Sequence, residues 1–227
     1  MPRNTRTSGS KRRTLSIGGA TYDLFVRLPA DIVAKHTKEG TFALPLGAKI
    51  IVKEIIECCG GGANNTSVGF ARLGCHASFE GVIGSDQWGE KLRENFRREG
   101  VNSECVTVVE GEVTSFSIIL SGSSRERVIL YQSGTNRHLH DMMFNKDIMK
   151  RVDWVYLNHI QEGSCVIQDD IAEILSEKGA PCLTWNPGGH QIRKGMSEKD
   201  NAHMLAHTDL LVLNKEEAAE FSGAATT

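Results

Sequence analysis

The sequence lacks several features that would assign it to a specialised class of protein. No apolar run approaches the roughly 20 residues that cross a bilayer, and the basic N-terminus has no apolar segment of a secretory signal. The net charge of −2 argues against a general nucleic-acid-binding protein. The six cysteines form no C-x-x-C pair, which favours reduced thiols over disulfides or zinc. We therefore expect a cytoplasmic protein that binds neither membrane nor nucleic acid.

The length of 227 residues allows one large domain or two small ones. Hydrophobic residues make up 40% and charged residues 24% of the chain, as in ordinary globular domains. Residues 1–13 are basic and polar and predict a disordered tail, with targeting or nucleic-acid binding as the alternative. From about residue 132, strands alternate strictly with helices. This order predicts a mainly parallel sheet with helices on both faces.

The most informative stretch is Gly60 to Gly74, which reads G-G-G-A-N-N-T-S-V-G-F-A-R-L-G. Glycine has no Cβ, so the first three residues can bend sharply and lie close to a ligand. Asn65, Thr66 and Ser67 stand where a helix would start and can cap it, and Gly74 is placed to end it in a left-handed turn. Free N–H groups at such a helix start suit an oxygen-rich small molecule. A tight strand-to-helix connection without a ligand is the structural alternative.

A second candidate lies nearer the N-terminus. Thr14–Ile17 predict a strand that ends in Gly18-Gly19, and Asp23 follows shortly afterwards. Open α/β sheets bind ligands at the carboxyl ends of their strands, so Asp23 is a candidate ligand-binding carboxylate. A turn in which Asp23 bonds its own backbone is the alternative.

These residues resemble the first signature of the ribokinase family, also called the PfkB carbohydrate kinase family. In that signature a Gly-Gly pair and an Asn precede V-x-x-A-R-L-G. Gly60, Gly61, Asn65 and the run Val68 to Gly74 match it place by place. The resemblance implies that Gly60, Gly61 and Asn65 line a sugar pocket and that Asp23 accepts hydrogen bonds from sugar hydroxyls.

The resemblance covers residues 14–227 and implies that they form one α/β domain, a three-layer αβα sandwich with a small β lid. The lid strands would be inserted at about residues 24–57 and 115–132, although their apolar, partly alternating sequences fit edge strands of the main sheet equally well. In the family the lid covers the sugar and can serve as a dimer surface, which implies a homodimer. Asn136, just beyond the second segment, is implied to approach the substrate.

Further polar residues follow the later predicted strands. Asn186 follows the buried strand Cys182–Trp185, and Asn214 and Glu217 follow the apolar strand Asp209–Leu213. By themselves Asn214 and Glu217 cannot be distinguished from a helix capping box. The resemblance implies that Asn186, Asn214 and Glu217 serve the cofactor side, where Asn214 reaches the phosphates of ATP and Glu217 acts on Mg²⁺ through water.

Two more polar residues follow the predicted strand Val152–Asn158. Glu162 is a candidate for contact with the sugar, because some members of the family place a carboxylate there. We interpret His159 as a loop histidine rather than as a catalytic base.

The family's second signature, D-T-x-G-A-G-D, has no counterpart in this sequence. In the family its glycines hold the transferred phosphate, and its last Asp is the general base. We therefore assign no catalytic residue and expect a C-terminally truncated chain that transfers phosphate poorly.

Three functions are compatible with these residues. The first is an ATP-dependent kinase that phosphorylates a hydroxyl of a sugar or nucleoside. The second is a non-catalytic sugar-binding or assembly module that retains the pocket and the lid. The third, a nicotinamide-dependent enzyme, is disfavoured because no G-x-G-x-x-G follows the first strand.

Overall fold

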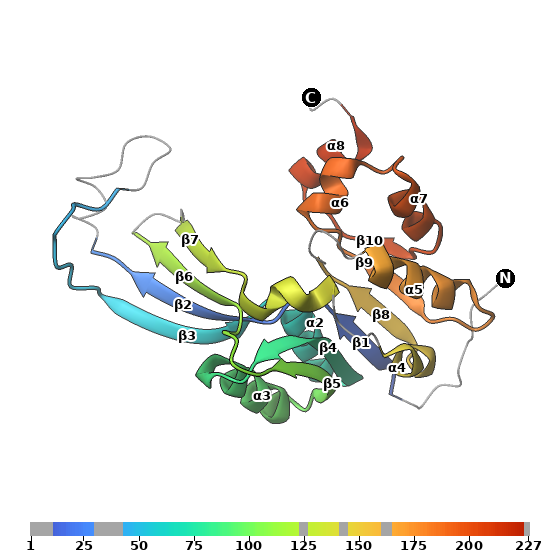
Figure 1. Cartoon of the computed structure of the whole chain (residues 1–227), viewed down its shortest axis with the longest axis horizontal. Coiled ribbons are helices and arrows are strands. Elements are labelled where there is room, and N and C mark those ends of the chain that lie inside the picture. The colour runs from blue at the N-terminus through green and yellow to red at the C-terminus, as the bar shows by residue number, and fades with distance from the viewer. Residues whose placement is uncertain (1–10, 30–42, 123–126, 141–144, 160–164, 225–227) are drawn as a thin grey trace.

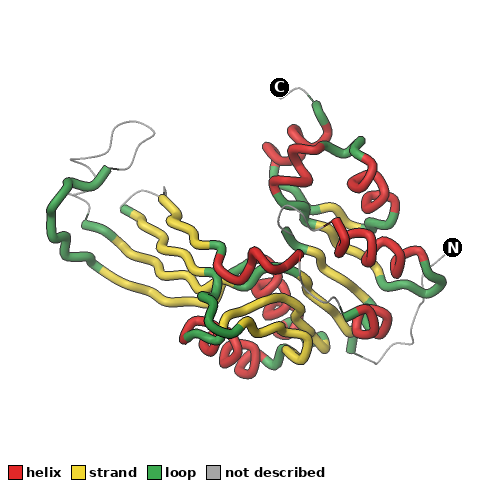
Figure 2. Tube along the Cα trace, in the orientation of Figure 1, coloured by secondary structure: helices red, strands yellow, loops and turns green. Residues whose placement is uncertain are grey.

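The computed structural model describes residues 11–29, 43–122, 127–140, 145–159 and 165–224. Two β-sheets organise these residues, and the smaller sheet projects away from the larger one (Figure 1). Figure 2 shows helices on both sides of the larger sheet, whereas the strands of the smaller sheet extend beyond them. Within the described ranges, every helix is too short or too polar to span a bilayer.

The larger sheet has the strand order β10-β9-β8-β1-β4-β5, and all neighbouring strands are parallel. Its strands are β1 (Arg13–Ile17), β4 (His76–Gly84), β5 (Asn102–Val109), β8 (Trp154–Leu157), β9 (Cys182–Trp185) and β10 (Leu210–Leu211). The predicted α/β fold with a mainly parallel central sheet is therefore confirmed. The chain starts in the middle at β1 and builds outward first through β4 and later through β8. The carboxyl ends of all six strands consequently meet at one edge, where open α/β sheets bind ligands.

Helices cover the larger sheet from both sides, which gives three layers. On one face, α2 (Gly62–Arg72) and α3 (Gln87–Glu99) enclose a core that includes Phe79 and Phe96. The other face is covered by η1 (Gly134–His140), α4 (Lys146–Arg151), α5 (Cys165–Ser176), α6 (Gly189–Lys194), α7 (Lys199–Ala206) and α8 (Lys215–Ser222). Leu15, Leu183 and Trp185 belong to that second core. Successive side chains of a strand point to opposite faces, so two separate cores form on one sheet.

The smaller sheet, which we call the lid sheet, is built from the two inserted segments. Its strands are β2 (Thr21–Arg27), β3 (Glu54–Gly60), β6 (Phe116–Ser121) and β7 (Arg127–Gln132), in the order β3-β2-β6-β7. These strands therefore leave the main sheet instead of extending its edges. Trp88 on α3 stacks on Tyr22 and Phe116, with ring centroids 4.8 and 5.2 Å apart, and fixes the root of the lid sheet.

The start of α2 differs from the prediction. The helix begins at Gly62 with Gly61 as its N-cap, so Asn65, Thr66 and Ser67 lie inside its first turns. The hydroxyl of Thr66 donates to the carbonyl of Gly62 at 2.8 Å, and Ser67 likewise bonds back along the helix. The prediction that these residues cap the helix was wrong, because the helix already begins at Gly62, directly after the N-cap Gly61 that is packed against Gly19.

Two other predicted helix boundaries are confirmed. Gly74 has φ +87°, and its N–H donates to the carbonyl of Ala71 at 2.9 Å, which ends α2 in a left-handed turn. Asp86 caps α3 by accepting the N–H of Gly89 at 2.9 Å. The same carboxylate accepts the hydroxyl of Thr114 at 2.6 Å and its N–H at 3.0 Å. Asp86 therefore ties α3 to the segment that enters the lid sheet.

Other expectations need correction. Asp23 lies within strand β2 and not in a loop after β1, and the strand expected at Asp209–Leu213 is confined to β10. The sequence patterns gave no sign of β5, η1 or α6. Glu162 lies outside the described residues. The same holds for most of the predicted basic tail, most of the long loop between the first lid strands, the tip of the second lid hairpin and the first part of the helix expected at Asp141–Met149.

Glu80, on the inner part of β4, is a buried carboxyl group that is 1% exposed. One carboxylate oxygen accepts the N–H of Asn145 at 2.7 Å, and the other has no hydrogen-bond partner within the described part of the chain. Loss of hydration raises the pKa of Glu80 from its ordinary value of 4.5 to about 7.

We predict that Glu80→Gln makes the protein more stable at pH 8 and has little effect at pH 4.5. The pKa of Glu80 is raised in the folded state, so the protonated carboxyl group contributes fully to stability below the unfolded pKa, and this contribution is lost as the pH rises through about 7. Gln cannot ionise, so the variant keeps its stability at pH 8. The expected gain at pH 8 is on the order of 2 kcal/mol in the free energy of unfolding, measured with urea.

The exposed Glu104 on the neighbouring strand β5 provides the control. Glu104→Gln should leave the pH dependence of unfolding unchanged. A Glu80→Gln effect of equal size at both pH values would contradict the raised pKa.

Candidate functional site

A small cavity lies where the carboxyl ends of β1 and β8 meet the Gly-rich stretch and the lid sheet. We call it the edge cavity; its volume is about 140 Å³. Its lining consists of Gly19, Thr21, Gly61, Gly62, Tyr131, Asn136, Leu139, Asn158 and His159. The fold therefore gathers residues from five separate parts of the chain around one space at the ligand-binding edge of the sheet.

The glycines of this region are required by close packing. Gly61 has φ +93°, and a Cβ at this position would lie 2.5 Å from the carbonyl oxygen of Gly19. A Cβ at Gly62 would collide with the side chain of Asn158, and a Cβ at Gly60 would collide with the carboxylate of Asp23. The backbone of Gly61 and Gly62 consequently forms this wall of the edge cavity.

Asp23 lies beside the edge cavity without lining it. Across the lid sheet it stands in register with Cys58, Ser117 and, one strand further, Tyr131. Residues in register share a face of the sheet, so Asp23 faces the same side as Tyr131, which lines the cavity. Loss of hydration raises the pKa of Asp23, and a hydrogen bond from Ser117 only partly opposes this effect.

Asn65 lies in a different place from the other predicted sugar-binding residues. It is exposed on α2 and lines a second cavity of about 380 Å³ along the edge of β3, together with Cys58 and Cys59. Its Oδ1 accepts from Nδ2 of the buried Asn64 at 3.3 Å. The structure therefore does not bring Asn65 and Asp23 into one cavity. Cys58, which lines the second cavity, is the residue directly opposite Asp23 on strand β3.

Asn136 does lie in the edge cavity. It is 4% exposed, and its Nδ2 is 3.4 Å from both Thr21 Oγ1 and Tyr131 Oη. Its Oδ1 is buried and has no hydrogen-bond partner within the described ranges. A buried acceptor without a donor costs about 1–3 kcal/mol, so a ligand hydroxyl that reached this atom would remove an existing penalty.

The residues predicted for the cofactor side are held by protein contacts. Asn186 Oδ1 accepts from Asn158 Nδ2 at 2.9 Å, and Asn186 Nδ2 donates to the carbonyl of Val212 at 2.8 Å. Asn214 and Glu217 form a capping box, in which Oδ1 of Asn214 accepts the N–H of Glu217 at 2.8 Å and Oε2 of Glu217 accepts the N–H of Asn214 at 2.9 Å. The capping alternative is therefore present in the structure.

The second oxygen of Glu217 and the Nδ2 group of Asn214 have no hydrogen-bond partners among the described residues. In the same ranges, no group of three or more His, Cys, Asp or Glu side chains could hold a metal ion directly. A carboxylate oxygen and an amide donor next to each other suit a water-bound cation and a phosphate, respectively.

His159 also lines the edge cavity. Its ring lies so close to Gly188 that a Cβ there would collide with Nδ1. Loss of hydration, together with smaller effects of the neighbouring Arg193 and His190, lowers the pKa of His159, which favours the neutral imidazole at pH 7. This histidine therefore offers the cavity a neutral polar edge and not a cation.

Sequence reasoning missed Asn158, although the signal was present. Asn158 directly follows the apolar residues of β8, as Asn186 follows those of β9. Only the strand order shows that the two strands are neighbours and that their terminal asparagines touch.

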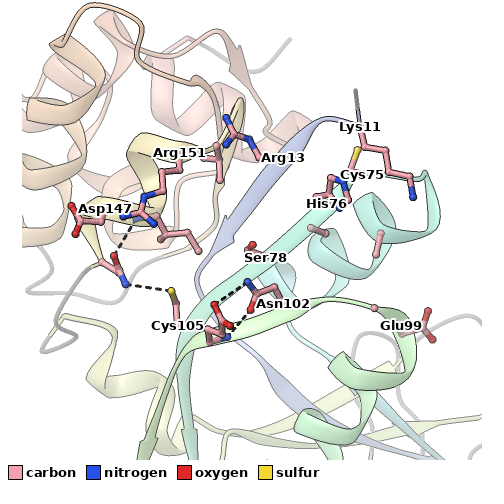
Figure 3. A pocket seen from close by; sticks show the side chains of 17 residues that line it. Lys11, Arg13, Cys75, His76, Ser78, Glu99, Asn102, Cys105, Asp147 and Arg151 are labelled. Atoms are coloured by element: carbon pink, nitrogen blue, oxygen red, sulfur yellow. Dashed lines mark hydrogen bonds between the residues drawn. The ribbon is translucent and has the colours of Figure 1, made fainter. Parts of the chain in front are cut away.

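A larger cavity of about 770 Å³ lies at the opposite edge of the sheet, at the amino ends of β1, β4 and β5 (Figure 3). Its lining includes Arg13, His76, Asp147 and Arg151, which Figure 3 shows around its mouth. It contains none of the predicted site residues. The amino ends of parallel strands are not where α/β sheets bind their ligands, so the edge cavity remains the candidate site.

Comparison with known proteins identifies the family. The model of the pfkB family carbohydrate kinases matches residues 38–227. The chain belongs to this family. Over 172 residues it is 26% identical to ribokinase of Haemophilus influenzae, and this aligned region covers 72% of this chain and 51% of the relative. The chain thus spans about half the length of this curated pfkB family member.

Solved structures show the same fold. Arabidopsis thaliana ribokinase complexed with ribose and ATP has a TM-score of 0.75 at 20% identity, over 94% of this chain and 64% of that chain. Burkholderia thailandensis nucleoside kinase in complex with inosine has a TM-score of 0.68 at 14% identity, over 92% of this chain and 64% of that chain. The pfkB family chain described here therefore has the ribokinase fold.

We predict that Asp23→Asn raises the thermal midpoint Tm by about 2 °C at pH 7. The pKa of Asp23 is raised in the folded state, so ionisation of this carboxyl group destabilises the folded protein as the pH rises through that pKa. Asn does not ionise and therefore avoids this loss of stability. The gain should therefore shrink as the pH falls, because the wild-type carboxyl group becomes protonated. Thermal unfolding followed by circular dichroism between pH 4.5 and 8 measures this difference.

Asp86→Asn is the matched control for this prediction. Asp86 accepts three hydrogen bonds in the folded state, so loss of its charge should lower the midpoint at pH 7. If Asp23→Asn also lowered the midpoint at pH 7, Asp23 would be a structural carboxylate and not one kept for a ligand.

Proposed function

We propose that this chain provides the acceptor-binding part of an ATP-dependent kinase that phosphorylates a hydroxyl of a sugar or nucleoside. Membership of the pfkB family and the likeness to kinases bound to ribose or inosine support this proposal. The observation that carries it is the edge cavity, where the buried Oδ1 of Asn136 has no donor among the described residues and lies beside a wall of bare glycine backbone. Such a space suits a ligand that is rich in hydroxyl groups.

In this proposal the sugar is held between the lid sheet and the start of α2. Asp23 accepts hydrogen bonds from hydroxyls, Gly60 and Gly61 let the ligand approach the backbone, and Asn136 closes the far wall. Asn65 reaches the ligand only when the lid sheet and α2 draw together, because it lines the neighbouring cavity. Closure would also exclude water, which strengthens the polar contacts in the site.

The cofactor side rests on Asn214, Glu217 and Asn186. The capping box leaves the Nδ2 group of Asn214 for phosphate oxygens of ATP and one oxygen of Glu217 for a water on Mg²⁺. Asn186 is fixed at both ends of its amide and therefore supports the strand ends rather than contacting the nucleotide directly. The bound nucleotide would supply the phosphoryl group.

The general base and the anion hole of the family have no counterpart in this sequence. We therefore propose that this chain binds its acceptor with little phosphoryl transfer. The cytoplasm is its proposed compartment, because the six scattered cysteines form no C-x-x-C pair and fit reduced thiols better than disulfides or zinc.

The lid sheet is also proposed as a homodimer surface. Apolar side chains remain 47–55% exposed on both its edge strands, namely Ile55, Ile56, Ile129, Leu130 and Tyr131. A second copy would cover this apolar surface and the unpaired edges of the sheet.

Isothermal titration of the full chain with D-ribose, D-fructose and inosine tests the acceptor site. We expect at least one of them to bind and Asp23→Asn to weaken that binding at least tenfold, through loss of charged hydrogen bonds. Asp147→Asn, at the opposite edge of the sheet, should leave the affinity unchanged. A folded wild-type chain that binds none of the three would overturn the proposal.

Binding of Mg–ATP separates the kinase from a non-catalytic sugar-binding module. Glu217→Gln keeps the capping box, since Gln can also accept at that position, but removes the charge that faces the hydrated cation. We expect it to weaken Mg–ATP binding about tenfold, whereas the neighbouring exposed Glu216→Gln should have no effect. No measurable Mg–ATP binding by a wild-type chain that binds sugar would favour the module.

A further inference from the structure

Two asparagine side chains connect three neighbouring strands at the edge that carries the candidate site. Asn158 follows β8, Asn186 follows β9, and Val212 follows β10. The side chain of Asn158 donates to Oδ1 of Asn186 at 2.9 Å, and Asn186 in turn donates to the backbone carbonyl of Val212 at 2.8 Å. We call this chain of hydrogen bonds the amide relay.

The amide relay has a fixed direction. A backbone carbonyl can only accept, so the NH₂ group of Asn186 must face Val212. Oδ1 of Asn186 must then face Asn158, which in turn places the NH₂ group of Asn158 toward Asn186. The hydroxyl of Tyr156 lies 3.4 Å from Oδ1 of Asn186 and adds a second donor to the same atom. Oδ1 of Asn158 consequently points away from the relay.

This oxygen atom of Asn158 faces the candidate site. A Cβ built on Gly62 would meet Oδ1 of Asn158 before any other atom, and both residues line the edge cavity. No described residue donates a hydrogen bond to it. Asn136 is held less firmly, because among the described residues its Nδ2 contacts the hydroxyls of Thr21 and Tyr131 at 3.4 Å. The amide relay instead fixes Asn158 so that it presents an acceptor to the cavity.

We propose that Asn158 is a specificity-determining residue whose Oδ1 accepts a hydrogen bond from one ring hydroxyl of the acceptor sugar. This inference rests on the proposed function and names a further contact in the same site. The cavity of about 140 Å³ has room for about five water molecules, the size of one small sugar ring. Because a fixed acceptor cannot adapt to a missing donor, a sugar without that hydroxyl leaves Oδ1 unpaired and binds more weakly.

The test compares ring-deoxy analogues on two variants of Asn158. Isothermal titration uses D-ribose with its 2-deoxy and 3-deoxy forms, and inosine with its 2′-deoxy and 3′-deoxy forms. In the wild type, loss of one of the two hydroxyls should weaken binding about threefold to tenfold. In Asn158→Ala, that penalty should disappear, whereas the effect of removing the other hydroxyl should be the same as in the wild type.

Asn158→Asp is the conservative variant. It keeps an oxygen toward the cavity but places a second acceptor against Oδ1 of Asn186, so we expect a lower Tm together with an intact penalty for the deoxy analogue. Equal weakening of every ligand in both variants, or an unchanged penalty in Asn158→Ala, would overturn the inference and leave the proposed function standing. If neither D-ribose nor inosine binds the wild type, this inference fails, and so does the proposed function for these two acceptors.

Discussion

The close contact between the Gly-rich stretch and the end of β1 is the constraint on which the rest of the site depends. Gly61 lies against the backbone of Gly19, and any side chain there would push α2 away from the sheet. Because this contact is made by backbone alone, the start of α2, the root of the lid sheet and the carboxyl ends of β1 and β8 can all reach one small space. The edge cavity therefore depends on the absence of a side chain at Gly19 and Gly61.

The sequence predicted the fold well because the signals for it are local. Alternating apolar strands and helices gave the parallel sheet, and Asp86 and Gly74 marked helix boundaries through short-range bonds. Strand β5 was missed because none of its residues is fully buried and half of them are polar, so its pattern is weak. The start of α2 was misplaced because propensity disfavours glycine in a helix, whereas packing against Gly19 and Asn158 overrides that preference.

The site was less predictable than the fold, because its geometry depends on which strands become neighbours. Asp23 was predicted from its position after the first strand together with the family resemblance, and Asn136 from the resemblance alone. The sequence could not show that Asn65 lines a separate cavity from Asn136. Asn214 and Glu217 illustrate another limit. A capping box and a cofactor site use the same residue types at the same spacing, and the structure contains the capping bonds whether or not the second role exists.

The polar groups of this edge fall into two kinds, and the difference bears on function. Those that serve the fold, such as Asp86 and Asn186, have their hydrogen-bonding capacity used by the protein. Asp23 has a partly dehydrated carboxylate, and Asn136 has a buried carbonyl without a hydrogen-bond partner among the described residues; both features lower stability. A ligand with several hydroxyls would donate hydrogen bonds to both groups and remove that cost. Their position beside bare backbone, at the carboxyl ends of the strands, is the physical reason to regard this edge, and not the larger cavity at the other end of the strands, as the candidate site.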